Sequence, residues 1–438
     1  MNLRGKRLLV IGANGNICNA VQRARELGIY VIVTDYFEDS PAKKIADKAY
    51  LVSTADTDKL AEICRAEKID GVFTGYSELN LNFTERLCAR MGYPFYATAE
   101  QVNTLTNKEL FKAACNRFGV SSVKAYQISE NPTEEELKDI VFPVIVKPVD
   151  SYSGKGITIC KNEDGIAEAI AKAKSVSGSK RYLVEQYMRD EDYDIFTVYY
   201  TLQDGKAVLS GIVDRYMYTF PNKRRLSTVL LYPSEYLDRY LSEMDEKVKK
   251  MFAGLGLRNG TIFMEGAVNE TGFYFWECGY RLCGAQQGII TGYINNADVE
   301  EMLIRYALTG KMSEEDVTVL EDPNLKGKTA TNLLIFSKVG RIKEVTGIET
   351  VKKLEGVINY TALIGKDHII APEDEGTLNQ SIARLHLVAD SRPKMVDLIN
   401  KVYSILEAKG ENGENLILNT FDSDFLLHAS TRFSGKRR

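Results

Sequence analysis

Residues 6–98 alternate short apolar runs with amphipathic stretches, and this restricts the possible folds more than any other feature of the chain. The apolar runs cover 7–11, 30–34, 49–52 and 71–74, and the stretches at 20–27 and 57–67 have a helical pattern. Strands that alternate with helices form a parallel sheet with right-handed crossovers. We therefore predict an N-terminal α/β domain over residues 1–103.

The remaining sequence changes pattern. With 438 residues the chain is too long for one ordinary core. An α+β pattern follows through residue 180, another begins with the strand-like run at 181–185, and an amphipathic helix at 392–408 stands among short strand signals. We predict a multidomain α/β and α+β fold divided into 1–103, 104–180, 181–316 and 317–438.

The segment 142–160 predicts a strand, a glycine-rich loop and a second strand. Its first β-branched run ends at Lys147, which would present an ammonium group at the strand end. The loop can approach an anion closely with its backbone N–H groups. A glycine and a strand-like run follow Lys155, which excludes a Walker A loop. The segment is either a phosphate-binding loop or an ordinary hairpin. The residues that would contact phosphate are Ser153, Gly154, Lys155 and Gly156.

The first strand is followed by a glycine-rich turn that imitates a dinucleotide-binding fingerprint. The turn contains Gly12 and Gly15, and Asp35 ends the second strand. The turn lacks the GxGxxG spacing, because Cys18 stands at the third glycine position. Because the match is only partial, a nicotinamide-dependent oxidoreductase is kept as an alternative and not as the main interpretation.

Two other positions suggest contacts with a ligand. Ser77 and Glu78 follow the fourth strand, at the carboxyl end of the predicted sheet, where ligands bind in such folds; a simple polar loop is the alternative. Thr106 and Glu109 fit a capping box at a helix start. Lys108 then lies in the first turn, where the helix dipole disfavours a cation, and this hints at an anionic ligand.

The segment 260–281 predicts a hairpin with acidic residues. A three-residue loop at 270–272 makes Asn269 face Phe273 and brings Glu265 opposite Glu277. Like charges on facing positions are unfavourable unless a cation lies between them, and Mg²⁺ is the cation that suits carboxylates and phosphates. Arg281 would add a guanidinium group on the same side of the strand as Glu277, where it could bind a phosphate or carboxylate through two hydrogen bonds. The alternatives are a register slip, or an Arg281 that only neutralises Glu277.

The overall composition excludes several classes of function. The formal net charge is −4, and no block of like charge is longer than the GKRR at the C-terminus, which argues against nucleic acid or an anionic membrane as partner. No export signal or membrane-spanning run is present, so a cytoplasmic protein is expected. The seven cysteines are scattered and the chain has only three histidines, which leaves little for disulfides or zinc.

Taken together, these motifs resemble the ATP-grasp superfamily of carboxylate–amine ligases, in the branch of biotin carboxylase and carbamoyl-phosphate synthetase. The resemblance spans nearly the whole chain, in order. It implies a pre-ATP-grasp domain, two ATP-grasp lobes and a C-terminal region, with ATP and Mg²⁺ as cofactors. The resemblance implies that the substrates are a small-molecule carboxylate, expected to be an amino acid or peptide-like compound, and an amine. A homodimer is the expected assembly.

The resemblance also assigns ATP-binding roles. Lys108 and Lys147 match the two phosphate-binding lysines, and the loop 151–156 matches the flap that closes on the phosphates. The segment 184–188 is similar to the hinge between the lobes. There Glu185 and the backbone of Gln186 and Met188 would hold adenine, and Asp192, or its neighbour Glu191, would hold ribose.

Glu265 and Glu277 match the Mg²⁺ ligands of the family, and Arg281 matches the arginine that steadies the acyl phosphate. The family pattern has asparagine where this chain has Gly279, which puts a second Mg²⁺ in doubt and leaves a non-catalytic ATP-binding protein as an alternative. Arg215 resembles a substrate-facing residue of amino-acid ligases. It is our candidate for the substrate carboxylate, with a surface pair to Asp214 as the alternative.

Overall fold

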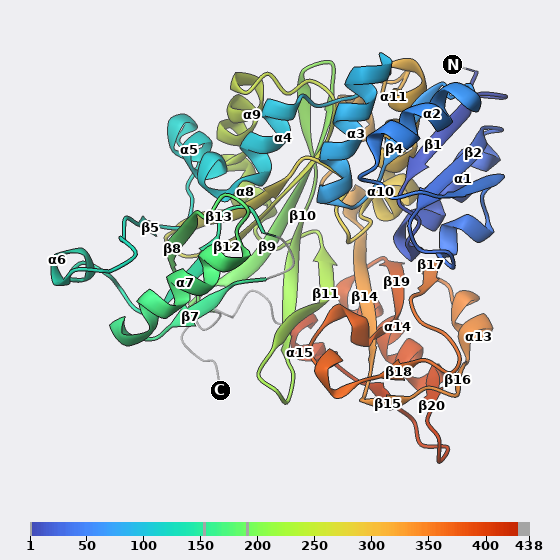
Figure 1. Cartoon of the computed structure of the whole chain (residues 1–438). Coiled ribbons are helices and arrows are strands. Elements are labelled where there is room, and N and C mark those ends of the chain that lie inside the picture. Colours follow the sequence, from blue (N-terminus) through green and yellow to red (C-terminus); the bar gives the residue numbers. More distant parts are fainter. Residues whose placement is uncertain (1, 152–154, 190–191, 428–438) are drawn as a thin grey trace.

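The computed structural model describes residues 2–151, 155–189 and 192–427. Figure 1 shows a large central sheet, with the N-terminal domain on one side, a small lobe on the other and the C-terminal region below. None of the helices in the described ranges is long and apolar enough to cross a membrane.

The N-terminal domain is a parallel four-stranded sheet, as predicted. Its strands β1 (Arg7–Ile11), β2 (Tyr30–Asp35), β3 (Lys48–Leu51) and β4 (Gly71–Thr74) lie in the order β3-β2-β1-β4. Helices α1 (Cys18–Glu26), α2 (Thr57–Ala66) and α3 (Glu78–Met91) connect or follow these strands. A later helix, α11 (Val299–Thr309), completes the core of this domain, where Val299 and Leu303 pack with Val10 and Val21.

Residues 104–188 contain a separate antiparallel sheet, the small lobe. The strands β5 (Ala125–Tyr126), β6 (Val144–Pro148), β7 (Thr158–Cys160) and β8 (Tyr182–Gln186) lie in the order β5-β8-β6-β7. Helix α7 (Ile166–Val176) covers one face. The helices α4 (Ala99–Thr106) and α5 (Lys108–Phe118) precede the sheet, and α6 (Glu134–Leu137) is a single turn.

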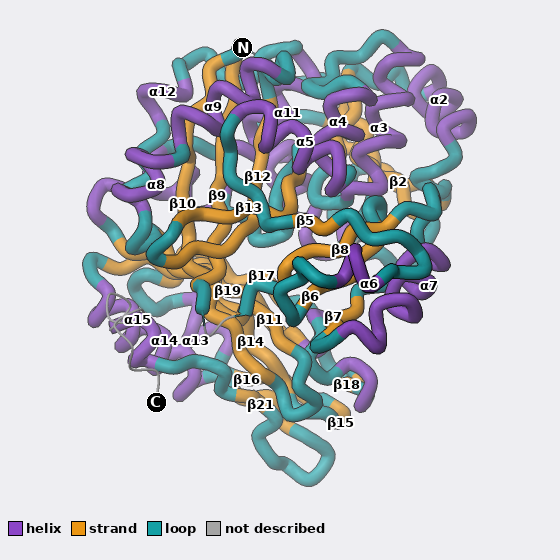
Figure 2. Tube along the Cα trace, turned by 90° about the vertical axis from the view of Figure 1, so that its left-hand side faces the viewer, coloured by secondary structure: helices purple, strands orange, loops and turns teal. Residues whose placement is uncertain are grey.

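The third sheet has nine strands and is continuous from the large lobe into the C-terminal region. Its order is β13-β12-β9-β10-β11-β14-β19-β17, and β21 pairs with β14. Figure 2 shows these strands running from the upper helices to the lower end of the molecule. Strands on both sides of residue 316 therefore belong to one sheet. The strands are β9 (Asp194–Gln203), β10 (Lys206–Thr219), β11 (Arg225–Tyr232), β12 (Gly260–Asn269), β13 (Gly272–Gly279), β14 (Thr329–Ser337), β17 (Val357–Ala362), β19 (Ser381–Ala389) and β21 (Ile417–Leu418).

The other elements lie around this sheet. Helices α8 (Leu237–Glu243), α9 (Asp245–Gly254), α10 (Gly288–Asn295) and α12 (Val317–Leu320) belong to the large lobe and its exit, and α13 (Ile348–Lys352), α14 (Arg392–Ile405) and α15 (Ser423–Leu427) to the C-terminal region. The short strands β15 (Gly340–Arg341), β16 (Glu344–Thr346), β18 (Ile369–Ile370) and β20 (Glu407–Lys409) form two small ribbons.

Two local predictions need correction. Thr106 does not cap the helix of Lys108: it ends α4, and Asn107 caps α5 by accepting from the backbone N–H groups of Glu109 and Leu110. The predicted three-residue loop of the acidic hairpin is also wrong, because Asn269 pairs with Gly272.

The facing carboxylates were nevertheless predicted correctly, because the strands contain a β-bulge. Gly266 pairs with Phe275, and the next pair is Glu265 with Glu277. Trp276 is the extra residue on its strand, so the bulge restores the pairing that the wrong loop would have lost.

Candidate active site

Lys147 lies at the end of β6, on the face of the small-lobe sheet that is turned away from α7. Val144 and Val146 pack in the core against α7, so the alternate residues Ile145 and Lys147 face the other side. The Lys147 residue is only 5% exposed, and its ammonium nitrogen lies 2.5 Å from the Glu185 carboxylate.

Glu185 holds a second lysine as well. Lys112, from the buried face of α5, lies 2.9 Å from the other carboxylate oxygen. Burial raises the pKa of Glu185, but Lys147 and Lys112 outweigh this and the pKa is lowered; burial lowers the pKa of Lys112. With both lysines protonated, the three side chains carry one net positive charge. The predicted contact between the Glu185 side chain and adenine stays a prediction.

Lys108 joins α5 to the glycine-rich loop. Its ammonium group donates to the carbonyl of Ser151 (2.9 Å), and its backbone N–H donates to Val149 (3.2 Å). At the other end of the loop, Gly156 has a φ of +78°, and a Cβ there would lie 2.8 Å from Pro148. Glycine is therefore required at this position. Ser153 and Gly154 lie outside the described residues, and Lys155 is exposed.

The residues expected at the hinge are placed as follows. Gln186 ends β8, and its N–H donates to the carbonyl of Lys124 (2.9 Å). Met188 is buried beside Val123 and Ala267. Asp192 is partly exposed and forms an ion pair with Arg189 (2.8 Å), while Glu191 lies outside the described residues. A ribose contact of Asp192 would have to compete with this ion pair.

Arg215 pairs with one of the two facing carboxylates. Its guanidinium lies 2.6 Å from Glu265, across the sheet from β10 to β12. Asp214, the alternative partner, instead accepts from the Ser234 hydroxyl and from the Glu235 N–H (3.2 Å). Burial lowers the pKa of Arg215, but Glu265 outweighs this and the pKa is raised. Arg215 therefore stays charged inside the site.

Arg281 contacts Glu78 at 3.4 Å rather than merely neutralising Glu277. Burial raises the pKa of Glu78, with Arg281 and Lys108 opposing and Glu277 adding to the effect, so all four side chains lie in one electrostatic neighbourhood. Ser77 supports this arrangement, because its hydroxyl caps α3 directly before Glu78. The buried Nε atoms of Arg281 and Arg215 have no hydrogen-bond partner among the described residues, which leaves each guanidinium a donor for an anion.

Gly279 is explained by its cross-strand partner. Phe263 pairs with Gly279, and a Cβ at residue 279 would lie 2.3 Å from the Phe263 ring. The Arg281 guanidinium lies over the same ring, 4.9 Å from its centre. An asparagine side chain therefore has no room here, because a buried aromatic ring takes its place.

The remaining carboxylates fit one Mg²⁺ bound together with phosphates. Glu265 and Glu277 offer hard oxygen donors from facing positions, and Mg²⁺ commonly takes one or two carboxylates, phosphate oxygens and water. Within the described ranges, no three His, Cys, Asp or Glu side chains gather in a metal-binding arrangement. Any further ligands would come from nucleotide and water.

Arg384 was missed by the sequence analysis. It lies on β19, is 7% exposed, and donates to Gly284 O (2.6 Å), Gln286 Oε1 (3.2 Å) and Asn16 Oδ1 (3.3 Å). Tyr199 and Cys283 influence the pKa of both Arg384 and Arg215, so the two guanidinium groups belong to one region. The signal was present in the strand: Arg384 and His386 are polar residues two positions apart in an apolar run.

Asp35 is engaged by the backbone. One carboxylate oxygen accepts from the N–H of Ala13 and the other from the N–H of Phe37, both at 2.9 Å. In a dinucleotide site this carboxylate would bind ribose. The contacts close the glycine-rich turn instead, which weakens the nicotinamide alternative.

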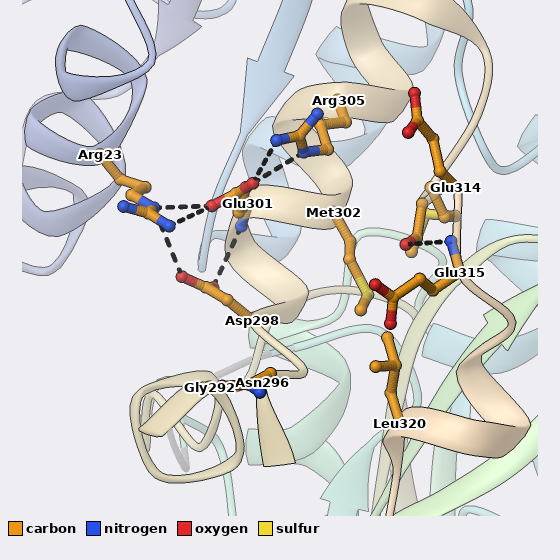
Figure 3. A pocket seen from close by; sticks show the side chains of 12 residues that line it. Arg23, Gly292, Asn296, Asp298, Glu301, Met302, Arg305, Glu314, Glu315 and Leu320 are labelled. Atoms are coloured by element: carbon orange, nitrogen blue, oxygen red, sulfur yellow. Dashed lines mark hydrogen bonds and ion pairs between the residues drawn. The ribbon is translucent and has the colours of Figure 1, made fainter. Parts of the chain in front are cut away.

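A separate cavity of about 410 Å³ lies on the outer side of α11. Figure 3 shows Arg23 and Arg305 on either side of Glu301. Their distances to Glu301 are 2.5 and 2.6 Å. Because both arginines are already neutralised and Glu314 and Glu315 also line the cavity, it offers acidic rather than basic groups to a ligand.

The fold and the site define a two-lobed nucleotide-binding protein, with lysines on the small lobe and carboxylates on the large one. The sequence matches two family models: "ATP-grasp domain" over residues 140–286 and "PylC-like, N-terminal domain" over residues 8–87. The chain therefore contains an ATP-grasp domain behind a PylC-like N-terminal domain, which confirms the predicted resemblance.

Curated relatives match over part of their length. A formate-dependent phosphoribosylglycinamide formyltransferase of Methanocaldococcus jannaschii is 31% identical over 198 residues, which are 43% of this chain and 49% of the relative. The enzyme of the same name from Sulfurisphaera tokodaii is 30% identical over 216 residues, 48% of this chain and 53% of the relative. The chain spans about half the length of these relatives.

Solved structures share the fold over nearly the whole chain. An L-amino acid ligase from Bacillus licheniformis has a TM-score of 0.74 at 17% identity, covering 92% of this chain and 98% of that one. The biotin carboxylase domain dimer of Hydrogenobacter thermophilus 2-oxoglutarate carboxylase, in complex with MgADP and bicarbonate, has a TM-score of 0.75 at 19% identity, covering 99% of both chains. At these identities the likeness concerns the fold.

Proposed function

We propose that this chain is an ATP- and Mg²⁺-dependent ligase that activates a small-molecule carboxylate as an acyl phosphate and joins it to an amine. The observation that carries the proposal is the charge arrangement around one site. Lys108, Arg281 and Glu277 all influence the pKa of the buried Glu78, and Glu277 faces Glu265 across the hairpin. Lys147 ends the small-lobe strand β6 beside Glu185. The names of the relatives, which are formate-dependent transferases and an amino-acid ligase, support this class of reaction.

The reaction brings two anions together, so the main task of the protein is to neutralise charge and to align the reactants. When bound, ATP would supply the phosphoryl group, and Mg²⁺, held by Glu265 and Glu277, would neutralise charge on the phosphates. Lys108 and Lys147 would hold the phosphates, and Arg281 would steady the acyl phosphate. The hinge at 184–188 would hold adenine, and Asp192 ribose.

Two side chains must exchange partners for this to happen. Lys147 is paired with Glu185, and Glu265 with Arg215. Lys112 remains on Glu185 when Lys147 turns to a phosphate, so the buried carboxylate keeps a counter-ion. Arg215, released by Glu265 when the metal binds, becomes available to the substrate anion, which is the role first predicted for it.

Phosphate release tests the proposal. The protein is incubated with ATP, Mg²⁺ and pairs of carboxylates and amines, and released phosphate and the products are measured, the latter by mass spectrometry. We expect Lys147→Ala and Glu277→Ala each to lower turnover by more than about 100-fold, since each removes charge stabilisation of the transition state. Lys138→Ala and Glu270→Ala change exposed residues of the same lobe and hairpin and should have no effect.

Near-normal turnover in either site variant would contradict the assigned roles. ATP-induced stabilisation without phosphate release from any pair would favour the non-catalytic alternative. A homodimer, suggested by the dimeric biotin carboxylase domain, is a separate proposal, and light scattering at micromolar concentration tests it.

A further inference from the structure

Two buried ionisable side chains, an arginine and a glutamate, lie near the proposed site without a partner of opposite charge among the described residues. Arg384 donates only to neutral acceptors, and its Nε has no partner; among the described residues it forms no ion pair. Glu300, in the first turn of α11, is 7% exposed and likewise has no cation beside it in the described part of the chain. Leaving a buried charge uncompensated is costly, so a buried ionisable group either loses its charge or needs a ligand that supplies the opposite charge.

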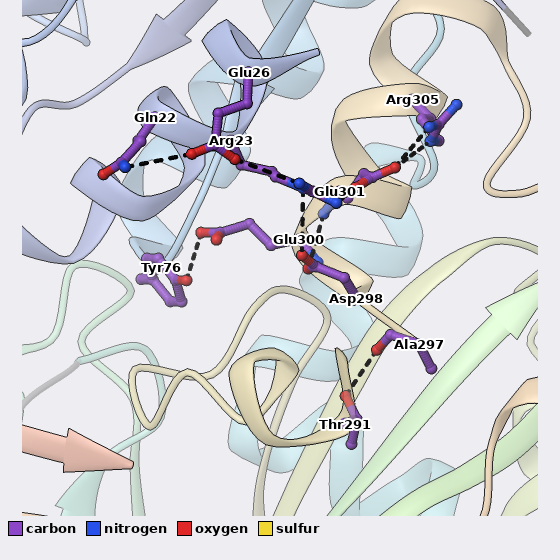
Figure 4. Close-up of polar contacts among 10 residues, drawn as sticks. All are labelled: Gln22, Arg23, Glu26, Tyr76, Thr291, Ala297, Asp298, Glu300, Glu301 and Arg305. Atoms are coloured by element: carbon purple, nitrogen blue, oxygen red, sulfur yellow. Dashed lines mark hydrogen bonds and ion pairs between the residues drawn. The ribbon is translucent and has the colours of Figure 1, made fainter. Parts of the chain in front are cut away.

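Tyr76 links the two groups. It lies in the loop between β4 and α3, and its hydroxyl donates to Glu300 at 2.6 Å. Figure 4 shows the two side chains pointing toward one another from the N-terminal domain and α11. Tyr76 also influences the pKa of Arg384, and Gln286 accepts from Arg384. The Glu300 carboxyl group and the Arg384 guanidinium are thus linked through Tyr76 and Gln286.

Electrostatics indicates which ligand would suit Glu300. Burial, with Asp298 adding to it, raises the pKa of Glu300 to about 8, so the carboxyl group is largely protonated at neutral pH. A cation placed beside it would favour the carboxylate form. The neighbouring Glu301 differs, because it points to the other side of the helix and is neutralised by Arg23 and Arg305.

Arg384 lies toward the reacting groups. Tyr199 and Cys283 are common neighbours of Arg384 and Arg215, and Arg215 contacts the proposed metal ligand Glu265. A carboxylate held at Arg384 would therefore lie on the side where the proposed activation occurs, with the ammonium subsite behind it.

We propose that Glu300 and Tyr76 bind the ammonium group of an α-amino acid whose carboxylate faces Arg384, so that the carboxylate substrate of this ligase is a zwitterion. This rests on the proposed function for the statement that the bound carboxylate is the one activated. The binding subsite itself stands on the buried Arg384, which has no anion beside it in the described part of the chain, and on the buried Glu300 carboxyl group with the Tyr76 hydroxyl that donates to it.

Equilibrium binding tests the subsite without turnover. Thermal unfolding of the full chain is followed with each of the twenty common amino acids, in both enantiomers, and with the matching acids that lack the α-amine. We expect at least one amino acid to raise the midpoint while its deaminated analogue does not. Glu300→Gln and Tyr76→Phe should weaken that binding by roughly 10- to 100-fold, because a hydrogen bond to a charged group is lost.

Glu301→Gln is the matched control on the same helix, and it should leave amino-acid binding unchanged. ATP affinity should be unchanged in all three variants, which separates a local effect from misfolding. Equal shifts with the amino acid and its deaminated analogue, no shift with any amino acid, or full binding in Glu300→Gln would each overturn the inference.

Hydroxylamine then separates the inference from the proposed function. With ATP and Mg²⁺ it traps an acyl phosphate as a hydroxamate. Amino-acid binding without hydroxamate would contradict the ligase proposal and leave the subsite standing. Hydroxamate formed as readily from the deaminated acid would support the ligase and overturn the zwitterion subsite.

Discussion

Among single residues, Gly279 shows how one neighbour decides what a position can hold. The family pattern has asparagine there, and its absence first suggested a weakened metal site. The structure gives a steric reason, since the Phe263 ring takes the space into which a side chain would extend. The ring also supports Arg281, so phenylalanine and glycine form a matched pair that keeps the arginine in place.

Gly279→Asn should therefore destabilise the chain, by about 1–3 kcal/mol as for other overpacked sites. Phe263→Ala should also destabilise it, because the ring is buried. In the double variant the two effects should be less than additive, since the smaller residue makes room for asparagine. Thermal midpoints of the four proteins give the coupling, and strict additivity would show that the two positions are independent.

Glu321 is another residue whose surroundings predict a measurable effect. It is buried, accepts from the Thr201 hydroxyl (2.9 Å), and burial raises its pKa from 4.5 to about 7. The folded state thus binds the proton more tightly than the unfolded state does. Its contribution to stability is fully present below pH 4.5 and is lost as the pH rises to 7.

Glu321→Gln removes this titration, so the variant should gain stability relative to the wild type between pH 5 and pH 8, by at most roughly 3 kcal/mol. Thermal midpoints measured across this range test it, with Glu315→Gln as an exposed control. Parallel pH curves for Glu321→Gln and the wild type would contradict the shifted pKa. The pKa of Glu300 is also raised. Its titration will therefore leave some pH dependence of stability in both the variant and the wild type.

Among the secondary-structure elements, what could be predicted depended on local pattern. The apolar run before Lys147 located the strand, and facing positions in the hairpin located Glu265 and Glu277, although a bulge rather than the expected loop sets their register. Lys112 and Arg384 were not predicted, because their roles come from elements far away in sequence. Lys112 meets Glu185 only when α5 packs on the small lobe, and Arg384 needs β19 beside the N-terminal turn.

The contact between α5 and β8 allows a comparison of buried and exposed ion pairs. Glu185→Gln leaves two buried lysines without an anion, and we expect a loss of about 3–5 kcal/mol. Glu109→Gln removes the exposed pair with Arg181, which joins α5 to the chain just before β8, and should cost about 0–1 kcal/mol. Denaturant unfolding measures the free energy of unfolding of both variants. Similar losses of stability would show that the buried ion pair contributes no more than the exposed one.

Across the whole molecule, the site is assembled from three parts that differ in how they are connected. The N-terminal domain contributes Tyr76 and Glu78, and the small lobe with its preceding helix α5 contributes Lys147 and Lys108. The nine-stranded sheet contributes Arg215, Glu265, Glu277 and Arg384. That sheet is continuous through β11 and β14, whereas the small lobe has its own sheet and its own core. Because β8 belongs to the small-lobe sheet, the small lobe ends after β8 and not at the predicted residue 180. This boundary separates two sheets, whereas the predicted division at residue 316 falls within one.

Hydrogen exchange should reveal this difference. The central strands β9, β10, β14 and β19 are buried and paired on both sides, so their amides should exchange slowest and together. The small lobe should open separately and exchange faster, because it can detach without breaking the large sheet. ATP with Mg²⁺ should slow exchange in β6 and β8, since ligand binding stabilises the closed form. If the small-lobe strands are as protected from exchange as β14 without nucleotide, the small lobe does not open independently. Closure over the nucleotide would then need another hinge.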